Sequence, residues 1–444
     1  MDKTLFFGFA AALCLSFPAA VMAQDVPGET AATDVFAAAS TVAVGEGDDA
    51  PVTDILHAVR VAKIKLERER LKRLEIWGGN PPVYGEFPAR AEIVLAVWRK
   101  DAKTVNLYLA DKQGARLWMK SPGAPPISVS QHAQVNSRYA IPEGHSATVV
   151  GVLYPVMDET VVSGRTSYRT RETVHVPISR EMFVPDILTA GSDYLSFLVR
   201  DAHDEMARRG IRSRTYPDRL LSEIVDPYLI KSIVVIEHSG HQKLLGDSDP
   251  ESVLGNFYVN LAVNGETAFD EAESSAGALG LAQFIPSTYA LFVRNRPDLG
   301  LIPDFRAGMA DHRNALIAEA AYFDDSLRLL PADLREKYLI NPSAVAAYLA
   351  AAYNGGVTRV KRAYLNFGED WDQYHGGNHS LRPETVTYVA KLRKVYSMME
   401  TGVYATPSAP NNAIPAERTV AVAQTSFDPV GTVCFGDGSC VTVN

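Results

Sequence analysis

The chain has little cysteine, no excess of positive charge, and no long apolar run beyond its first two dozen residues. Its formal net charge of -9 argues against a nucleic-acid partner held by a general basic field. Because no later segment is long and apolar enough to span a bilayer, no transmembrane helix is predicted after the N-terminus. At 444 residues the chain exceeds one typical domain, so we expect two or more folded units.

The N-terminal segment MDKTLFFGFAAALCLSFPAAVMAQ is typical of a secretory signal peptide. Lys3 precedes an apolar stretch, and Val21 and Ala23 occupy the two key positions of a cleavage site. The alternative, a single membrane anchor, needs about 20 apolar residues, and Pro18 interrupts this run. We therefore predict a signal peptide at 1–23 and an exported chain that is soluble after cleavage.

Two of the three cysteines remain after such cleavage, Cys434 and Cys440 in CFGDGSC. In an exported protein, two close cysteines around a Gly-Asp-Gly turn favour a small disulfide loop. A metal site is the competing interpretation, but further cysteine or histidine ligands are lacking nearby. We predict a disulfide between Cys434 and Cys440.

The pattern of apolar and polar residues changes several times along the chain. Short alternating runs such as AEIVLAVW, TVNLYLA and ATVVGVLYPV, separated by Gly and Pro breaks, predict an antiparallel β-sandwich-like domain without a catalytic constellation. A region of helical periodicity with repeated cap signals follows it. The predicted organisation is a flexible lead-in at 24–51, a helical segment at 52–82, the β-rich domain at 83–186, an all-α domain at 187–402, and a linker with the cysteine loop at 403–444.

The segment 52–76 is predicted to be a helix with a charge-dense second half. Its apolar residues Ile55, Val59, Ala62 and Leu66 recur at helical spacing. Such a helix either packs on a neighbouring element or binds a partner. A protein partner is thus possible through this helix or through the β-rich domain.

The stretch DPYLIKSIVVIEHSGH at 226–241 predicts an apolar helix that carries one acid at its end. Asp226 is suited to cap the helix and Pro227 to its first position. Ile233 and Val234 lie four and three residues before Glu237, and therefore on the same face. Burial raises the pKa of a carboxyl group, as a general acid requires, although a structural network has the same effect.

Three later stretches accompany this acid. SSAGALGLAQFIPSTY at 274–289 places glycines where backbone can approach a ligand closely, followed by Gln283. NPSAVAAYLAAAYNGG at 341–356 predicts a helix that delivers Tyr353 and Asn354 at its end. RPETVTYVAKLRKVY at 382–396 predicts a helix that begins at a proline and carries Glu384 and Tyr388.

Together these pieces resemble the soluble lytic transglycosylase family, the lysozyme-like cell-wall lyases. In that family an apolar helix ends in Glu-Ser and is followed by Ser-x-x-Gly-Ala-x-Gly-Leu-Met-Gln, Ala-Tyr-Asn-x-Gly and Glu-Thr-x-x-Tyr-Val. This chain has the same order over about 215–400, with Ala282 at the usual methionine position. The resemblance implies a lysozyme-like catalytic domain.

The chain departs from the family at the acid itself. Glu237 is followed by His238 and then Ser239, and a longer segment, GNFYVNLAVNGETAFDEAE, precedes the Gly-Ala block. The Asn-Gly in that segment predicts a β-hairpin arm. The segment also brings a rival acid, Glu266, to about the family's distance before the block. Because Glu266 does not follow an apolar helix, Glu237 is the favoured catalyst and Glu266 the reserve.

The resemblance implies roles for these residues. Glu237 would act as general acid and then general base on the bond between N-acetylmuramic acid and N-acetylglucosamine, forming a 1,6-anhydro ring without a cofactor. Tyr388 would hydrogen-bond to Glu237. Ser239, Gln283, Tyr353 and Asn354 would line the glycan groove, whereas Glu384 favours a structural role in the first helical turn. His238 and His241 alone are too few ligands to predict a metal site.

Three functions remain open at this point. The first is a lytic transglycosylase acting on peptidoglycan strands, exported to the periplasm of a Gram-negative bacterium. The second is a weakly active or inactive wall-binding scaffold of an envelope-spanning secretion or conjugation assembly. The third is a hydrolase of the lysozyme type, which usually needs two carboxylates.

Overall fold

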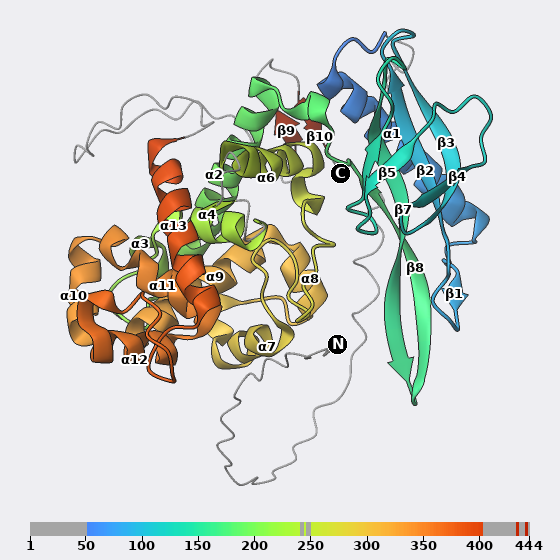
Figure 1. Ribbon diagram of the computed structural model, residues 1–444. Coiled ribbons are helices and arrows are strands. Elements are labelled where there is room, and N and C mark those ends of the chain that lie inside the picture. The colour runs from blue at the N-terminus through green and yellow to red at the C-terminus, as the bar shows by residue number, and fades with distance from the viewer. Residues whose placement is uncertain (1–50, 240–243, 246–249, 403–431, 435–439, 443–444) are drawn as a thin grey trace, which may run out of the picture. The chain divides into compact units, whose positions relative to one another are not determined.

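The computed structural model describes residues 51–239, 244–245, 250–402, 432–434 and 440–442 (Figure 1). The predicted signal peptide, the lead-in up to residue 50 and the predicted linker at 403–431 lie outside the described residues. The described residues between 51 and 402 belong to one compact unit, and the two short C-terminal strands belong to another. None of the helices in the described ranges has both the length and the hydropathy needed to cross a membrane.

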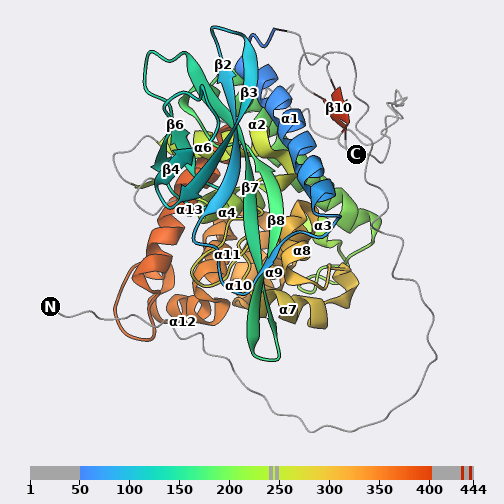
Figure 2. The ribbon, with the colours of Figure 1, turned by 90° about the vertical axis from the view of Figure 1, so that its right-hand side faces the viewer.

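The first part of the larger unit is an antiparallel six-stranded sheet with the order β1-β8-β7-β2-β3-β4. Every neighbouring pair is antiparallel, as predicted from the short runs of alternating apolar and polar residues separated by turns. Figure 2 shows β7 and β8 running on together beyond β2 and β3 as a two-stranded arm. The strands are β1 (Val83–Tyr84), β2 (Ala91–Arg99), β3 (Thr104–Gln113), β4 (Arg116–Met119), β7 (Ala147–Val162) and β8 (Arg165–His175).

One face of this sheet is covered by α1 (Ile55–Ile76), which confirms the helix predicted at 52–76. Asp54 caps the helix by accepting a hydrogen bond from the backbone N of His57 at 2.8 Å. Ala62 and Leu66 are fully buried against Gly151 of β7, where an added Cβ would lie 2.6 Å from Leu66 Cδ1. The apolar stripe of α1 therefore packs on the chain's own sheet, and Lys65 and Arg73 of its charged part bond to the sheet as well.

The opposite face of the sheet is covered by the segment between β4 and β7, which contains only the short pair β5 (Ser128–Gln131) and β6 (Arg138–Ala140). The antiparallel prediction is confirmed, but the second sheet of a sandwich is reduced to these two strands. Prolines in SPGAPP and at Pro142 remove backbone donors from the segment, so it cannot form longer ladders. Val135 and Tyr139 nevertheless complete a buried cluster with the sheet.

The second part of the larger unit is helical. Its main helices are α2 (Pro185–Arg208), α3 (Leu221–Ile224), α4 (Pro227–Glu237), α6 (Pro250–Asn264), α7 (Pro286–Asn295), α8 (Phe305–Ala310), α9 (His312–Leu329), α10 (Ala332–Ile340), α11 (Ser343–Gly355), α12 (Val357–Phe367) and α13 (Pro383–Thr401). The 3₁₀ turns are η1 (Arg180–Met182), η2 (Gly265–Thr267), η3 (Pro297–Leu299) and η4 (Gly368–Asp370). Proline begins several of these helices, because its fixed φ suits the first helical position.

The hairpin predicted around Asn264-Gly265 is wrong, because the chain forms α6 there and ends it in η2. Leu254, Phe257 and Leu261 lie at i, i+3 and i+7 and are all buried, which is a helical pattern that the Asn-Gly signal obscured. Gly265, at φ +59°, follows the last helical residue and takes the left-handed conformation common at helix ends.

Hydrogen bonds join the sheet part to the segment that follows α6. The buried side chain of Asn264 accepts from the backbone N of Val176 at 2.8 Å and donates to the carbonyl of the same residue at 3.2 Å. Arg171 of β8 pairs with Glu271 at 2.7 Å. The sheet thus holds the start of the loop that leads to the predicted Gly-Ala block.

The C-terminal unit contains the antiparallel pair β9 (Thr432–Cys434) and β10 (Cys440–Thr442). The backbone register places Cys434 directly opposite Cys440. This pairing agrees with the predicted loop between the cysteines, and the disulfide itself stays a prediction.

Candidate active site

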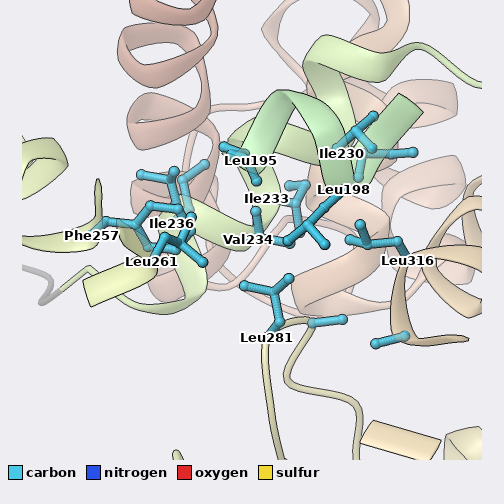
Figure 3. Close-up of a cluster of buried hydrophobic side chains, with 14 of the residues drawn as sticks. Leu195, Leu198, Ile230, Ile233, Val234, Ile236, Phe257, Leu261, Leu281 and Leu316 are labelled. Atoms are coloured by element: carbon cyan, nitrogen blue, oxygen red, sulfur yellow. The ribbon is translucent and has the colours of Figure 1, made fainter. Parts of the chain in front are cut away.

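The helix α4 is built as the sequence predicts. Asp226 accepts a hydrogen bond from the backbone N of Tyr228 at 3.0 Å, and Pro227 is the first helical residue. Figure 3 shows Ile233 and Val234 of this helix within a cluster that also holds Leu198 of α2. From Leu229 onward the helix is therefore buried except at Lys231 and its end, and it carries the partly exposed Glu237 as its last residue.

The carboxyl group of Glu237 meets the hydroxyl of Tyr388. Tyr388, on α13, donates a hydrogen bond to Oε1 of Glu237 at 2.6 Å. The Glu237 residue keeps part of its surface exposed, whereas Tyr388 is buried. Burial raises the pKa of Glu237 to about 7, against the opposing effects of the Tyr388 hydrogen bond and the charge of Lys391. The group can thus give up and regain a proton near neutral pH.

Lys391 is a neighbour of this acid that sequence reasoning missed. It lies three residues after Tyr388 on α13, is 2% exposed, and donates from Nζ to the carbonyl oxygen of Ser239 at 3.1 Å. Its charge favours the ionised form of Glu237. The spacing of i and i+3 from Tyr388 was the available signal, because it places both side chains on one face of the helix.

A second missed residue is Glu319 of α9, which is fully buried. Within the described part of the chain, neither of its carboxyl oxygens has a hydrogen-bond partner. Burial, and to a smaller degree the charge of Glu237, raise the pKa of Glu319 well above its ordinary value. An acid inside an apolar helical run, here LIAEAAYF, is the signal that pointed to Glu237 and would have found Glu319 as well.

His238 links the end of α4 to the loop of the Gly-Ala block. Its Nε2 lies 2.9 Å from the carbonyl oxygen of Leu281, so this nitrogen carries the proton and donates. The ring stacks on Phe269 with centroids 3.9 Å apart. Burial lowers the pKa of His238 to about 4, and the ring is therefore neutral near pH 7. The residue that departs from the family pattern thus has a structural contact in this chain.

Ser239 follows in a buried position at the helix end. Its hydroxyl donates to the carbonyl oxygen of Val235 at 2.5 Å. The predicted groove-lining role would have to use the remaining acceptor capacity of this hydroxyl. In the structure Ser239 closes the last turn of α4.

The loop at 272–285 is held by Gln283 and Gly280. Gln283 has φ +52° and donates from Nε2 to the carbonyl oxygens of Ala272 and Gly280, at 3.0 and 2.9 Å. Gly280 has φ +69°, and an added Cβ would lie 2.3 Å from the carbonyl oxygen of Met309. Both residues therefore fix the loop, and Gln283 offers its amide oxygen as the group still available to a ligand.

Tyr353 and Asn354 lie at the end of α11, as the sequence predicts, but they differ in surroundings. The hydroxyl of Tyr353 donates to the carbonyl oxygen of Ala282 at 2.5 Å, and its ring packs edge-on against Phe284. Asn354 is exposed and accepts from the hydroxyl of Thr385 at 2.8 Å. Gly355 permits this approach, because an added Cβ there would lie 2.6 Å from Thr385 Oγ1.

The reserve acid lies apart from this group. Glu266 is exposed at the start of η2, and its charge acts on Asp270 and Tyr194. The groups that shift the pKa of Glu237 are Tyr388 and Lys391, and Glu266 is not among them. The structure thus gives the desolvated setting to Glu237, as the sequence predicts.

In the described ranges, no group of three or more His, Cys, Asp and Glu side chains is placed to hold a metal ion. His238 is held by the contacts given above, and His241 lies outside the described residues. A cavity of about 360 Å³ is lined by Tyr348, Trp371 and Tyr396, among others, and not by Glu237.

Comparisons with protein-family models, with curated proteins and with solved structures found no match for this chain. One partly exposed carboxyl with a pKa of about 7, held by a tyrosine, is equipped for general acid and base catalysis by a single group.

Proposed function

We propose that this protein is an exported peptidoglycan lytic transglycosylase with Glu237 as its only catalytic acid and base, and that its helical part has a lysozyme-like fold. The observation that carries the proposal is the hydrogen bond from Tyr388 to a carboxyl whose pKa is raised to about 7. The four motifs in the order of the soluble lytic transglycosylases supply the substrate class.

The reaction uses one proton on one carboxyl. Protonated Glu237 donates its proton to the glycosidic oxygen between N-acetylmuramic acid and N-acetylglucosamine, and the bond from that oxygen to C1 breaks. The 6-hydroxyl oxygen of the same muramic acid then bonds to C1, and its proton returns to Glu237. Because nucleophile and electrophile belong to one sugar, proximity replaces an activated water. No cofactor is required.

The surrounding residues suit both halves of this cycle. Burial favours the protonated acid that starts the reaction. The hydrogen bond from Tyr388 and the charge of Lys391 stabilise the carboxylate that forms when the proton has left. The opposing effects hold the pKa near neutral pH, where both forms are accessible.

A hydrolase with two carboxylates has one observation in its favour, the nearby Glu319. A second carboxylate must reach water or the sugar, either as base or as nucleophile. Glu319 is fully buried and its pKa is raised well above the ordinary value, so burial favours its neutral form and shields it from water and sugar. This burial favours the single-acid reaction.

Digestion of purified sacculi, analysed by mass spectrometry, tests the proposal. We expect 1,6-anhydro-muropeptides from the wild type, none from Glu237→Gln, and wild-type amounts from the matched control Glu266→Gln. Reducing ends in place of anhydro ends would identify a hydrolase. Binding to sacculi without either product would identify a scaffold, and full activity of Glu237→Gln would overturn the site assignment.

A further inference from the structure

A second cavity, of about 270 Å³, lies in the sheet part of the protein, away from Glu237. It is formed by the segment before β2, the end of β3, the loop after β5, and β7. Its lining residues are Phe87, Pro88, Ala89, Arg90, Ala91, Lys112, Gln113, Gly114, His132, Ala133, Gln134, Tyr154, Pro155 and Met157. The lining contains no aspartate or glutamate, although the chain as a whole has a formal net charge of -9.

Lys112 is the buried cation of this cavity. The residue as a whole is 4% exposed, and in the described ranges no hydrogen bond or ion pair joins its ammonium group to another residue; the nitrogen itself keeps access to the cavity. Its recorded contact is with the ring of Tyr154, whose centroid lies 5.6 Å from Nζ. Burial lowers the pKa of Lys112. Partial removal of a cation from water is unfavourable unless an anion compensates it, and such an anion would have to enter from the cavity.

Arg90 adds a second positive charge to the lining of the cavity, beside that of Lys112. Arg90 is exposed, and its guanidinium lies 4.4 Å from the centroid of the Trp118 ring. Among the described residues, no carboxylate forms an ion pair with Arg90. His132 is exposed on the same lining. The remaining walls combine apolar side chains with Gln113 and Gln134, and Phe87 is 58% exposed at the surface.

We propose that this cavity, with Lys112 in its lining, binds a carboxylate that is carried on a small apolar or peptide-like group. One buried ammonium matches one negative charge, whereas the walls formed by Tyr154, Pro155 and Met157 match an apolar body. A doubly charged phosphate would leave charge facing these apolar walls. The site does not involve Glu237. A result that contradicts carboxylate binding here would therefore leave the proposed lyase activity untouched, and the reverse also holds.

Isothermal titration calorimetry of the full chain tests the site with a matched pair of probes. N-acetylalanylalanine carries a terminal carboxylate, and N-acetylalanylalaninamide has nearly the same shape without the charge. We expect the carboxylate to bind at least about tenfold more tightly, the scale of a hydrogen bond between charged groups. Equal affinities, or tighter binding of inorganic phosphate, would overturn the proposal.

Lys112→Met keeps the length of the side chain and removes its charge. We expect this variant to lose the preference for the carboxylate while it melts at the wild-type temperature or above, because an unpaired buried cation is gone. Lys361→Met, an exposed position on α12, is the control and should bind like the wild type. Retained carboxylate preference in Lys112→Met would overturn the proposal.

Arg90→Gln tests the site without touching the buried position, in case Lys112→Met fails to fold. Loss of the rim charge should weaken carboxylate binding by about threefold or more and leave amide binding unchanged, because exposed charges contribute modestly. Unchanged carboxylate binding in this variant would contradict a role for the cavity mouth.

Discussion

Tyr388 donates a 2.6 Å hydrogen bond to Glu237, a residue 151 positions earlier in the chain. The bond joins the end of α4 to the first half of α13, and it is made by a buried hydroxyl to a partly exposed acid. It favours the ionised form of Glu237, whereas burial favours the neutral form. The pH dependence of the protein should therefore respond to changes at either residue.

Tyr388→Phe should move the alkaline limb of the activity profile to higher pH. Activity requires protonated Glu237, so it falls as the pH rises through the pKa of about 7. The hydrogen bond lowers this pKa, and removing it raises the pKa further. We also expect a rate loss of about tenfold, because the carboxylate formed in the reaction loses a donor. Release of anhydro-muropeptides measured from pH 5 to 9 checks both effects.

Tyr364→Phe is the control for that change, because it removes a tyrosine hydroxyl bonded to Asp333 outside the site. This variant should keep the wild-type profile. A Tyr388→Phe limb that stays in place or moves to lower pH would contradict the assigned direction of the hydrogen-bond effect.

Glu237→Gln should be more stable than the wild type at alkaline pH. The folded protein raises the pKa of Glu237 from 4.5 to about 7, so the unfolded chain binds fewer protons in that window. The stability of the wild type therefore falls as the pH rises from about 4.5 to about 7, by an amount on the order of 3 kcal/mol for this group. Glutamine does not ionise and avoids the loss.

Melting temperatures of the two proteins at pH 4.5 and pH 8 check this expectation. The variant should exceed the wild type at pH 8, and the difference should largely disappear at pH 4.5. A difference of the same size at both pH values would mean that the gain arises from packing and not from ionisation.

Glu319→Gln should retain activity and the wild-type alkaline limb. Glu319 is fully buried, neither of its carboxyl oxygens has a hydrogen-bond partner in the described ranges, and its pKa is raised well above the ordinary value, so burial favours its neutral form. A neutral amide of the same size then replaces a neutral acid. Kinetics on sacculi decide this point: inactivation as complete as that of Glu237→Gln would indicate a two-carboxylate reaction.

Gly280→Ala should destabilise the loop that packs beside the acid. The position has φ +69°, and an added Cβ would lie 2.3 Å from the carbonyl oxygen of Met309. We expect a cost of about 2 kcal/mol or more in the free energy of unfolding. Gly85→Ala is the matched control, since nothing lies within 4 Å of its added Cβ and its φ is ordinary. Thermal denaturation that ranks the two variants equally would refute the steric argument.

Much of the local structure could be predicted from the sequence, because its signals act over a few residues. Asp226 with Pro227 predicts the start of α4, and the Ile and Val residues of SIVVI predict its buried face. Pro383 likewise predicts the start of α13. The Asn-Gly signal at 264–265 misled, because the same dipeptide that turns a hairpin also ends a helix.

The sequence by itself determined that an acid ends an apolar helix and that antiparallel strands precede a helical region, because periodicity and caps are local. Only the tertiary structure decided what surrounds that acid. Tyr388 and Lys391 reach it from a helix far along the chain, Glu319 lies buried nearby, and Glu266 is left exposed. Desolvation and charge depend on distance in space, which spacing along the chain does not specify, and they set the pKa of Glu237.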